Sequence, residues 1–293
     1  HTGREGRTTI MRQEIRDAAE RLTASIRPFG KVIVAYSGGV DSALVASAAR
    51  RALGDGAIAV TVLSPTLPSW EVRDAGKIAE TLDVLHEYVR LDELDDPDFR
   101  SNTPDRCYHC KKRRIQLLEP LARERGATRI LDGSNLDDLG DDRPGYRAVL
   151  ESPMTMCPLI EARMTKAMVR ELSREWGIPG ATRPAAACLA SRIPHGTPLT
   201  GELLCRVERA EGILRDALPP ESRVRVRTTG DDARVEIDPA DFPSLLDETT
   251  RLTVLSGLKE AGFSRILLDL AGYVRGGANE LPGRQTWKHP DYH

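Results

Sequence analysis

The stretch that most constrains the fold of this chain is Lys31 to Ser42, with the sequence KVIVAYSGGVDS. Its apolar run, Val32 to Tyr36, shows no alternation of apolar and polar side chains, which predicts a strand covered on both faces of a parallel sheet. The glycine pair that follows allows a sharp turn, and the next residues open an apolar helix. We therefore expect an anion-binding loop at the end of a buried strand.

The residue types in this loop suit a nucleotide. The Ser37 and Ser42 hydroxyls and the free amides at the helix start are donors for phosphate, and Gly38 and Gly39 allow close approach. No lysine stands where a Walker A loop has one. Asp41 would repel bare phosphate, which is explained if it holds a Mg²⁺ ion shared with the nucleotide.

A Gly-Gly turn between strand and helix also occurs in loops that bind nothing. The complete string Ser-Gly-Gly-Val-Asp-Ser is more specific and resembles the PP-loop of ATP pyrophosphatases. That family cleaves ATP to AMP and pyrophosphate and adenylylates a substrate oxygen. The resemblance implies ATP and Mg²⁺ as cofactors and a fold like that of the adenine nucleotide α-hydrolases.

Strands and helices alternate over the first two thirds of the chain, which predicts an α/β, doubly wound parallel sheet with ligands at the carboxyl ends of its strands. Beyond the first strand, the pattern predicts strands at 57–63, 84–91 and 129–132 and helices at about 12–27, 69–82, 109–126 and 165–176. Thr165 is the expected N-cap of the last helix.

The pattern changes near Leu199, where a second, smaller α+β domain is expected. A helix at 201–218 precedes two strands, 223–227 and 233–237, separated by a turn signal, and a helix at 240–261 and a strand at 265–270 follow. We predict a tag remnant or disordered extension over 1–11, a PP-loop domain over 12–198 and the small domain over 199–293.

Composition excludes several partners. The 293 residues carry 42 Lys and Arg against 44 Asp and Glu, and only 4% are aromatic, so neither charge nor stacking surface favours nucleic acid. No apolar run approaches the roughly 20 residues that span a bilayer, and no signal-peptide core is evident. We expect a cytoplasmic protein without nucleic-acid or membrane partners. Five cysteines, an odd number, argue against a disulfide framework.

Three of the cysteines are candidates for metal binding or catalysis. Cys107 and Cys110 form a C-x₂-C pair, and Cys188 is a third candidate thiol. The pair can grip a metal, but buried thiols or a redox pair would have the same spacing. Three thiolates suit a 4Fe-4S cluster better than structural zinc, because His109 is badly placed to share the ion. The basic neighbours Arg106, Lys111 and Lys112 are expected to lower the thiol pKa values. We interpret the other two cysteines, Cys157 and Cys205, as buried packing residues.

Taken together, these motifs and several others resemble the LarE family over about residues 12–280. The segments that carry the resemblance are Ser37–Ser42, Ser64–Pro68, Arg106–Lys111, Asp132–Asp138, Arg143–Gly145, the stretch around Cys188, Arg223–Glu236 and Asp269–Tyr273. LarE proteins are ATP-dependent sulfur transferases that make the nickel-pincer nucleotide. The resemblance implies a small-molecule nucleotide substrate, pyridinium-3,5-biscarboxylic acid mononucleotide, whose carboxylates become thiocarboxylates.

The resemblance also implies the sulfur source. In members that have only the equivalent of Cys188, this cysteine is catalytic and surrenders its own sulfur. Members with three cysteines are thought to ligate a 4Fe-4S cluster that carries a replaceable sulfide, and the presence of Cys107 and Cys110 favours that route here. Homo-oligomers, and delivery of product to the metal-inserting enzyme of the same pathway, are expected from the family.

Several other residues have a predicted role, and some of them also have a non-functional interpretation. Ser64, Gly133, Asn135 and Asp138 are expected to line the ATP site, although residues 133–138 could be an ordinary Asx-rich loop. Arg225 and Arg227 could bind the substrate phosphate or simply form a solvated strand face. The remaining assignments are Ser191 and Arg192 near that phosphate, and Glu211 and Glu236 as possible metal ligands.

Rival classes are an amidating PP-loop synthetase, a cluster-dependent tRNA thiolation enzyme and a nucleotide sensor without activity. The chain shows no evident glutaminase domain, and its cysteines would be idle in an amidating enzyme. Neutral charge and scarce aromatics disfavour RNA. Trapping a thiolated product would distinguish a sulfur transferase from an amidating synthetase. A gel shift with bulk tRNA would test the tRNA thiolation enzyme.

Overall fold

The computed structural model describes residues 2–139, 144–182 and 187–273, with the backbone alone for 2–12. Arg143, residues 184–186 and the stretch after 273 therefore lie outside the described residues. The chain divides into two compact units, His1–Cys188 and Leu189–His293. The division comes ten residues before the predicted one at 198/199 because the turn η5 (Leu189–Arg192) packs on elements of the second unit.

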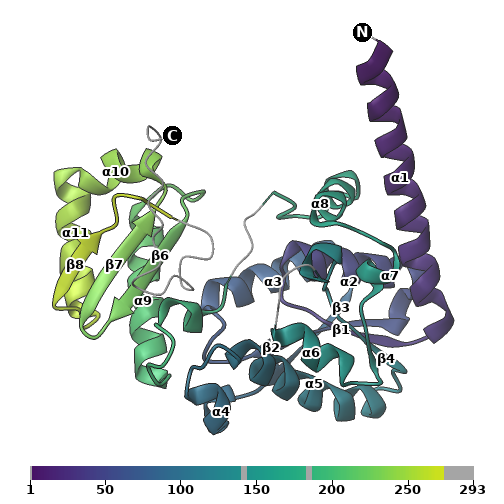
Figure 1. Cartoon of the computed structure of the whole chain (residues 1–293), viewed down its shortest axis with the longest axis horizontal. Coiled ribbons are helices and arrows are strands. Elements are labelled where there is room, and N and C mark those ends of the chain that lie inside the picture. The colour runs from purple at the N-terminus through teal and green to yellow at the C-terminus, as the bar shows by residue number, and fades with distance from the viewer. Residues whose placement is uncertain (1, 140–143, 183–186, 274–293) are drawn as a thin grey trace, which may run out of the picture. The chain divides into compact units, whose positions relative to one another are not determined.

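The first unit is built on a five-stranded parallel sheet in the order β3-β2-β1-β4-β5 (Figure 1). This arrangement confirms the predicted α/β fold class. Its strands are β1 (Val32–Ala35), β2 (Ala57–Leu63), β3 (Leu85–Arg90), β4 (Arg129–Leu131) and β5 (Thr155–Met156). Two residues are too few for a sequence pattern, which is why β5 was not anticipated.

Helices cover both faces of this sheet, as a buried parallel sheet requires. Val32 and Val34 of β1 point into the core on one face, and Ile33 points into the core on the other. The first core includes residues of α1 (Thr2–Ile26), α2 (Val40–Leu53), α3 (Ser69–Thr81) and α8 (Lys166–Glu175). The second is closed by α5 (Arg106–Glu124), against which α6 (Pro144–Leu150) packs. Two one-turn helices complete the unit, α4 (Pro97–Arg100) and α7 (Pro158–Glu161).

The strand order creates a binding crevice. From β1 the chain moves outward through β2 and β3 on one side, whereas β4 and β5 lie on the other. Adjacent strands at such a switch point send their following loops in opposite directions, and ligands of open α/β sheets bind between these loops. Here the switch point lies between β1 and β4, which are followed by the loop Ser37–Ser42 and the segment Asp132–Asp138.

The second unit is a three-stranded sheet, β6-β7-β8, with helices packed on one face. Strands β6 and β7 form the predicted antiparallel hairpin, and β8 pairs parallel to β7. The predicted helix at 240–261 is broken, because the carboxylate of Asp247 caps a new helix by accepting the Thr250 amide. Its elements are α9 (Gly201–Ala217), β6 (Val224–Thr229), β7 (Asp232–Ile237), α10 (Phe242–Leu246), α11 (Glu248–Glu260) and β8 (Arg265–Leu268).

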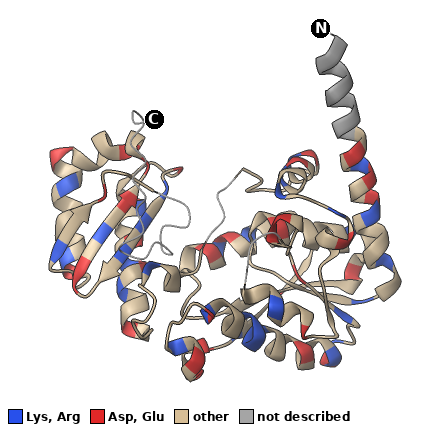
Figure 2. Ribbon diagram, viewed as in Figure 1, with Lys and Arg blue, Asp and Glu red and all other residues tan. Residues whose placement is uncertain are grey.

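Three further observations concern the helices and the distribution of charge. Helix α1 begins at Thr2, so the segment 2–11, predicted as an extension, is helical. Within the part of the chain that is described, no helix combines the length and apolarity needed to cross a bilayer. Acidic and basic residues are interspersed along the helices of each unit, in line with the net charge of -2 (Figure 2).

Candidate functional site

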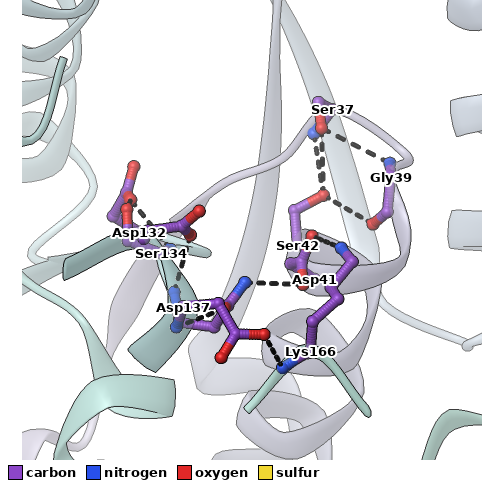
Figure 3. Close-up of polar contacts among 10 residues, drawn as sticks. Ser37, Gly39, Asp41, Ser42, Asp132, Ser134, Asp137 and Lys166 are labelled. Atoms are coloured by element: carbon purple, nitrogen blue, oxygen red, sulfur yellow. Dashed lines mark hydrogen bonds and ion pairs between the residues drawn. The ribbon is translucent and has the colours of Figure 1, made fainter. Parts of the chain in front are cut away.

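The loop after β1 presents an uncapped helix start. Gly39 is the N-cap of α2, and no side chain caps the first amides of that helix. The Ser42 hydroxyl donates to the Gly39 carbonyl at 3.0 Å and lies 3.2 Å from the Ser37 hydroxyl (Figure 3). Gly38 has a φ of +73°, and a Cβ there would lie 2.8 Å from atoms of Ala75. The loop thus needs glycine and leaves its donors available to an anion.

The segment after β4 closes against this loop. A Cβ on Gly133 would lie 3.0 Å from the Ser42 amide nitrogen, so the two backbones nearly touch. The Asn135 side-chain amide donates to Asp41 Oδ1 at 3.2 Å, and the Asn135 backbone amide donates to Asp138 Oδ2 at 2.9 Å. The structure therefore brings the predicted residues Gly133 and Asn135 onto the PP-loop, with Asp138 one contact further out.

Ser64 follows β2, the neighbour of β1, and so belongs to the same carboxyl edge of the sheet. Its hydroxyl accepts the Thr66 amide at 3.1 Å and lies 2.8 Å from the Thr66 hydroxyl. These bonds form a local turn. The structure shows no bond from Ser64 to the PP-loop among the described contacts.

One residue of this site escaped the sequence analysis. Lys166, the first residue of α8, forms an ion pair with Asp41 Oδ2 (Figure 3). Its backbone amide donates to Asp137 Oδ2 at 3.0 Å, and Thr165 caps the helix as predicted by accepting the Met168 amide. The loop that has no lysine of its own thus receives an ammonium group from a helix distant in sequence.

The three candidate cysteines lie near one another in the first unit. Cys188 contributes electrostatically to the pKa values of both Cys107 and Cys110, which lie one helical turn apart at the start of α5. The same helix links them to the carboxyl edge of the sheet, since Lys111 donates to Asp132 Oδ2 at 2.5 Å. Burial raises the pKa of Asp132, but Lys111 and Ser134 outweigh this and leave that pKa below its ordinary value.

A buried carboxylate and a partly buried guanidinium form an ion pair beside these thiols. Glu93, in the turn η3 (Glu93–Asp95), has no exposed surface, and its Oε1 lies 2.9 Å from the Arg114 guanidinium and 3.7 Å from Cys110 Sγ. Glu93 Oε2 has no hydrogen-bond partner among the described residues. Burial lowers the pKa of Arg114, but Cys110 and Glu93 more than offset it, so the pKa rises. The thiols thus lie beside a guanidinium group.

The expected lowering of the thiol pKa values is wrong. Desolvation raises the pKa of Cys110 to about 12, and it raises the pKa of Cys107, an exposed residue, despite the opposing effects of Arg106 and Lys111. Desolvation of the thiolate therefore outweighs the basic neighbours. Cys157 is buried as predicted, whereas Cys205 is exposed, which corrects the packing role assigned to it.

In the second unit, two predicted residues form a buried ion pair. Arg192 and Glu211 have side chains only 2% and 1% exposed, and the guanidinium donates to both carboxylate oxygens at 2.8 and 3.0 Å. Glu211 Oε1 also accepts the Val226 amide at 3.1 Å. The carboxylate proposed as a metal ligand is therefore engaged by a guanidinium and an amide.

The outer face of the β6–β7 hairpin concentrates arginines around one carboxylate. Arg227 and Arg234 both donate to Glu236 Oε1, at 2.6 and 3.0 Å, while no residue in the described part of the chain bonds the buried Glu236 Oε2. Arg225 shares this face, because it pairs with Glu236 across the hairpin, and its guanidinium lies 5.4 Å from the Tyr273 ring centroid. Ser191 joins through its carbonyl, which accepts from Arg227 at 3.0 Å.

Comparisons with known proteins agree with this geometry. The NAD synthase family model matches residues 14–126, which include the PP-loop. The pyridinium-3,5-bisthiocarboxylic acid mononucleotide synthase of Lactiplantibacillus plantarum is 35% identical over 88% of this chain and 92% of its own length. The chain belongs to the LarE family. The uncharacterized proteins slr1717 of Synechocystis sp. and MJ0830 of Methanocaldococcus jannaschii are 37% and 27% identical, over 89% and 83% of this chain and 97% and 90% of their own lengths.

As a LarE-family protein, the chain is an ATP-using enzyme with a PP-loop that acts on a nucleotide. Sequence reasoning found most of the residues that the structure brings together at this loop but missed Lys166 there, and it missed Glu93 and Arg114 beside the thiols. Lys166 carries a weak signal, since it follows a helix cap in a chain whose PP-loop lacks a lysine. Glu93 lies in an acidic segment that looks solvated, and nothing in the sequence marks it as buried.

Proposed function

We propose that this LarE-family enzyme adenylylates a carboxylate of a pyridinium dicarboxylic acid mononucleotide and replaces one of its oxygens with sulfur. A carboxylate is a poor electrophile because it has no good leaving group. Attack of its oxygen on the α-phosphorus of ATP expels pyrophosphate and leaves an acyl adenylate. A sulfur nucleophile then attacks the acyl carbon, and AMP departs with that oxygen.

The observation that carries the proposal is the link made by helix α5. One turn of this helix supplies Cys107, Cys110 and Lys111, and Lys111 is bonded to Asp132 at the nucleotide edge of the sheet. An activating loop and a group of thiols thus share one unit, as adenylylation followed by sulfur transfer requires. An amidating synthetase would have no use for these thiols.

Asp41 fits a Mg²⁺ ion, because its carboxylate offers hard oxygen donors and already binds a cation, the Lys166 ammonium group. The ion would supply charge neutralisation for the departing pyrophosphate. The uncapped amides at the start of α2 would bind phosphate oxygens, and the Ser37 and Ser42 hydroxyls would donate to them.

Cys107, Cys110 and Cys188 fit a 4Fe-4S cluster, because three thiols lie near one another and beside Arg114, whose charge offsets that of thiolates. Such a cluster would supply a replaceable sulfide. No three His, Cys, Asp or Glu side chains among the described residues converge on one ion, but a cluster spreads its ligands over several irons. In the alternative, Cys188 gives up its own sulfur.

The outer face of the β6–β7 hairpin suits the phosphate of the mononucleotide. Arg225 and Arg227 are bidentate donors for phosphate, and Arg234 adds a third guanidinium around Glu236. Arg192 is held by Glu211 and donates to the Ser191 hydroxyl at 2.9 Å, so its role would be to position Ser191.

The test is to incubate the enzyme anaerobically with ATP, Mg²⁺, sulfide and the dicarboxylic mononucleotide, and to follow AMP, pyrophosphate and product mass. We expect AMP and pyrophosphate in equal amounts and a product in which sulfur replaces oxygen. Hydroxylamine should trap the acyl adenylate as a hydroxamate. Absence of pyrophosphate with this acid, or an amide product when ammonia is supplied, would contradict the proposal.

Iron counting after anaerobic reconstitution separates the two sulfur sources. The cluster route predicts about four irons per chain, an intact-protein mass that is unchanged by turnover, and loss of iron–sulfur absorbance in Cys107→Ala. A chain without iron that loses the mass of one sulfur at Cys188 would instead establish the sacrificial route.

A further inference from the structure

Glu93 is bonded to its guanidinium partner through one oxygen only. Arg114 Nε donates to Glu93 Oε1 at 2.9 Å, and Arg114 Nη2 lies 2.9 Å from the same oxygen. Carboxylate and guanidinium groups frequently pair through two parallel hydrogen bonds, one for each oxygen, as Arg192 and Glu211 do in the second unit. Glu93 Oε2 meets no partner in the described part of the chain. The pairing thus leaves one anionic oxygen for another group.

This oxygen is withdrawn from solvent by a turn that is fixed at both ends. Glu93 has no exposed surface, and the Asp92 carboxylate before it accepts the Leu94 amide at 2.9 Å. The Asp96 carboxylate caps the following helix α4 in the same way, by accepting the Asp98 amide at 2.9 Å. A buried carboxylate oxygen without a partner costs free energy. A ligand that brings a cation to Oε2 would remove this cost.

The surroundings of the carboxylate are the three candidate thiols. Cys110 Sγ lies 3.7 Å from Glu93 Oε1. Burial is the main reason for the raised pKa of this thiol, and Glu93 adds to the rise. Cys188 and Cys107 also interact electrostatically with Cys110. The buried carboxylate therefore belongs to the same group of side chains as the proposed cluster ligands.

The chemistry of such a cluster leaves a place for an oxygen ligand. Three thiolates bind three of the irons and leave one iron without a cysteine. Side chains other than cysteine can complete an iron–sulfur centre, as histidine does in Rieske centres, and carboxylates bind iron in non-haem enzymes. A carboxylate is a harder ligand than sulfide, so sulfide can displace it from a site whose other ligands are all sulfur.

We propose that Glu93 Oε2 is the protein ligand of the iron that the three cysteines leave open, and that it yields this position to sulfide. When hydrosulfide enters, an iron–oxygen bond breaks and an iron–sulfur bond forms. The carboxylate remains an anion paired with Arg114, and no electron is transferred. The inference rests on the cluster form of the proposed function. It explains why both nitrogens of Arg114 converge on Oε1 and leave Oε2 aside.

The test uses the full chain, reconstituted anaerobically with ⁵⁷Fe and then freed of excess sulfide. Wild type is compared with Glu93→Gln and with a control, Asp95→Asn, which changes an exposed carboxylate in the same turn. Mössbauer spectra report whether one iron differs from the others in its ligands. EPR spectra of the reduced cluster in water enriched in ¹⁷O report whether that iron carries water, because the ¹⁷O nucleus broadens the signal. Pyrophosphate release is measured in parallel.

Wild type and Asp95→Asn should each show a distinct iron that accounts for about a quarter of the Mössbauer spectrum. Their EPR line should not broaden in ¹⁷O water, because a carboxylate oxygen occupies the position. Glu93→Gln should bind as much iron as the wild type, and its EPR line should broaden, since water takes the place of the carboxylate. Sulfide added to the wild type should abolish the oxygen-ligated signal.

Broadening of the wild-type line would overturn the proposal, because water would then be the ligand. Identical spectra of wild type and Glu93→Gln would overturn it too, as expected of a carboxylate that only pairs with Arg114. If Glu93→Gln holds no iron, the wild-type line still decides between carboxylate and water. A wild type that releases pyrophosphate but binds no iron would refute the inference and leave adenylylation standing. A wild type with the expected spectra but no pyrophosphate release would refute the proposed function alone.

Discussion

Cys110 Sγ lies 3.7 Å from Oε1 of Glu93, a carboxylate without exposed surface. The same oxygen accepts from Arg114 at 2.9 Å, whereas the second carboxylate oxygen meets no partner within the described segments. Burying a charged group with only one oxygen bonded costs free energy, so its presence calls for a role in the site. Glu93 therefore has a structural role, because it neutralises Arg114, and it also lies beside the thiols.

Replacing Glu93 with Gln should destabilise the first unit by about 1–3 kcal/mol, because the Arg114 side chain, 27% exposed, would lose its counter-charge. Thermal unfolding followed by circular dichroism measures the effect. Asp95→Asn, an exposed carboxylate in the same turn, is the matched control and should stay within about 0.5 kcal/mol of the wild type. Equal stability of the two variants would show that the Glu93–Arg114 pair contributes nothing.

Gly38→Ala should abolish detectable ATP binding and lower stability by about 1–3 kcal/mol. Gly38 has a φ of +73°, and the added Cβ would lie 2.8 Å from Ala75 backbone and side-chain atoms, so the loop must shift. Gly126→Ala is the control, because its φ of +69° imposes the same strain without any atom within 4 Å. Calorimetric titration with ATP should distinguish the two, and normal ATP binding by Gly38→Ala would contradict the assigned loop.

The Arg192–Glu211 pair should behave as a buried unit. Arg192→Met and Glu211→Leu should each cost about 3–5 kcal/mol, since each strands a charge that is almost fully buried. The double variant Arg192→Met/Glu211→Leu should recover most of this loss. Urea denaturation of the four proteins gives the coupling energy. Additive losses in the double variant would mean that the two side chains act independently.

The thiols should make stability fall at alkaline pH. Burial raises the pKa of Cys110 and of Cys157 to about 12, from about 9 in the unfolded chain. Between these values the folded state holds protons that the unfolded state has released, so the free energy of unfolding decreases as pH rises above about 9. Denaturation midpoints between pH 7 and 10.5 test this for the metal-free protein. Cys110→Ala should flatten the slope, and a slope unchanged by that substitution would contradict it.

Local patterns predicted the elements that position the site, and long-range contacts decided what they missed. The range 57–63 of β2 and the Thr165 cap could be read from neighbouring residues alone. Lys166 could not, because its partner lies 125 residues away. The predicted direction of the thiol pKa shifts was wrong for the same reason. The sequence shows the basic neighbours, but desolvation of the thiols depends on the folded chain. Only one cysteine, Cys205, was assigned the wrong environment.

Gly133, which follows β4, lies against the backbone at the start of α2 with no side chain between them. The two loops therefore cannot slide past one another, and a shift in one is transmitted to the other through backbone atoms. A ligand seated on the segment after β4 would alter the geometry offered to the triphosphate without touching it. Surface loops usually tolerate insertions, but an insertion in either of these loops would disturb the close backbone contact. This edge should therefore be the part of the sheet least tolerant of changes in length.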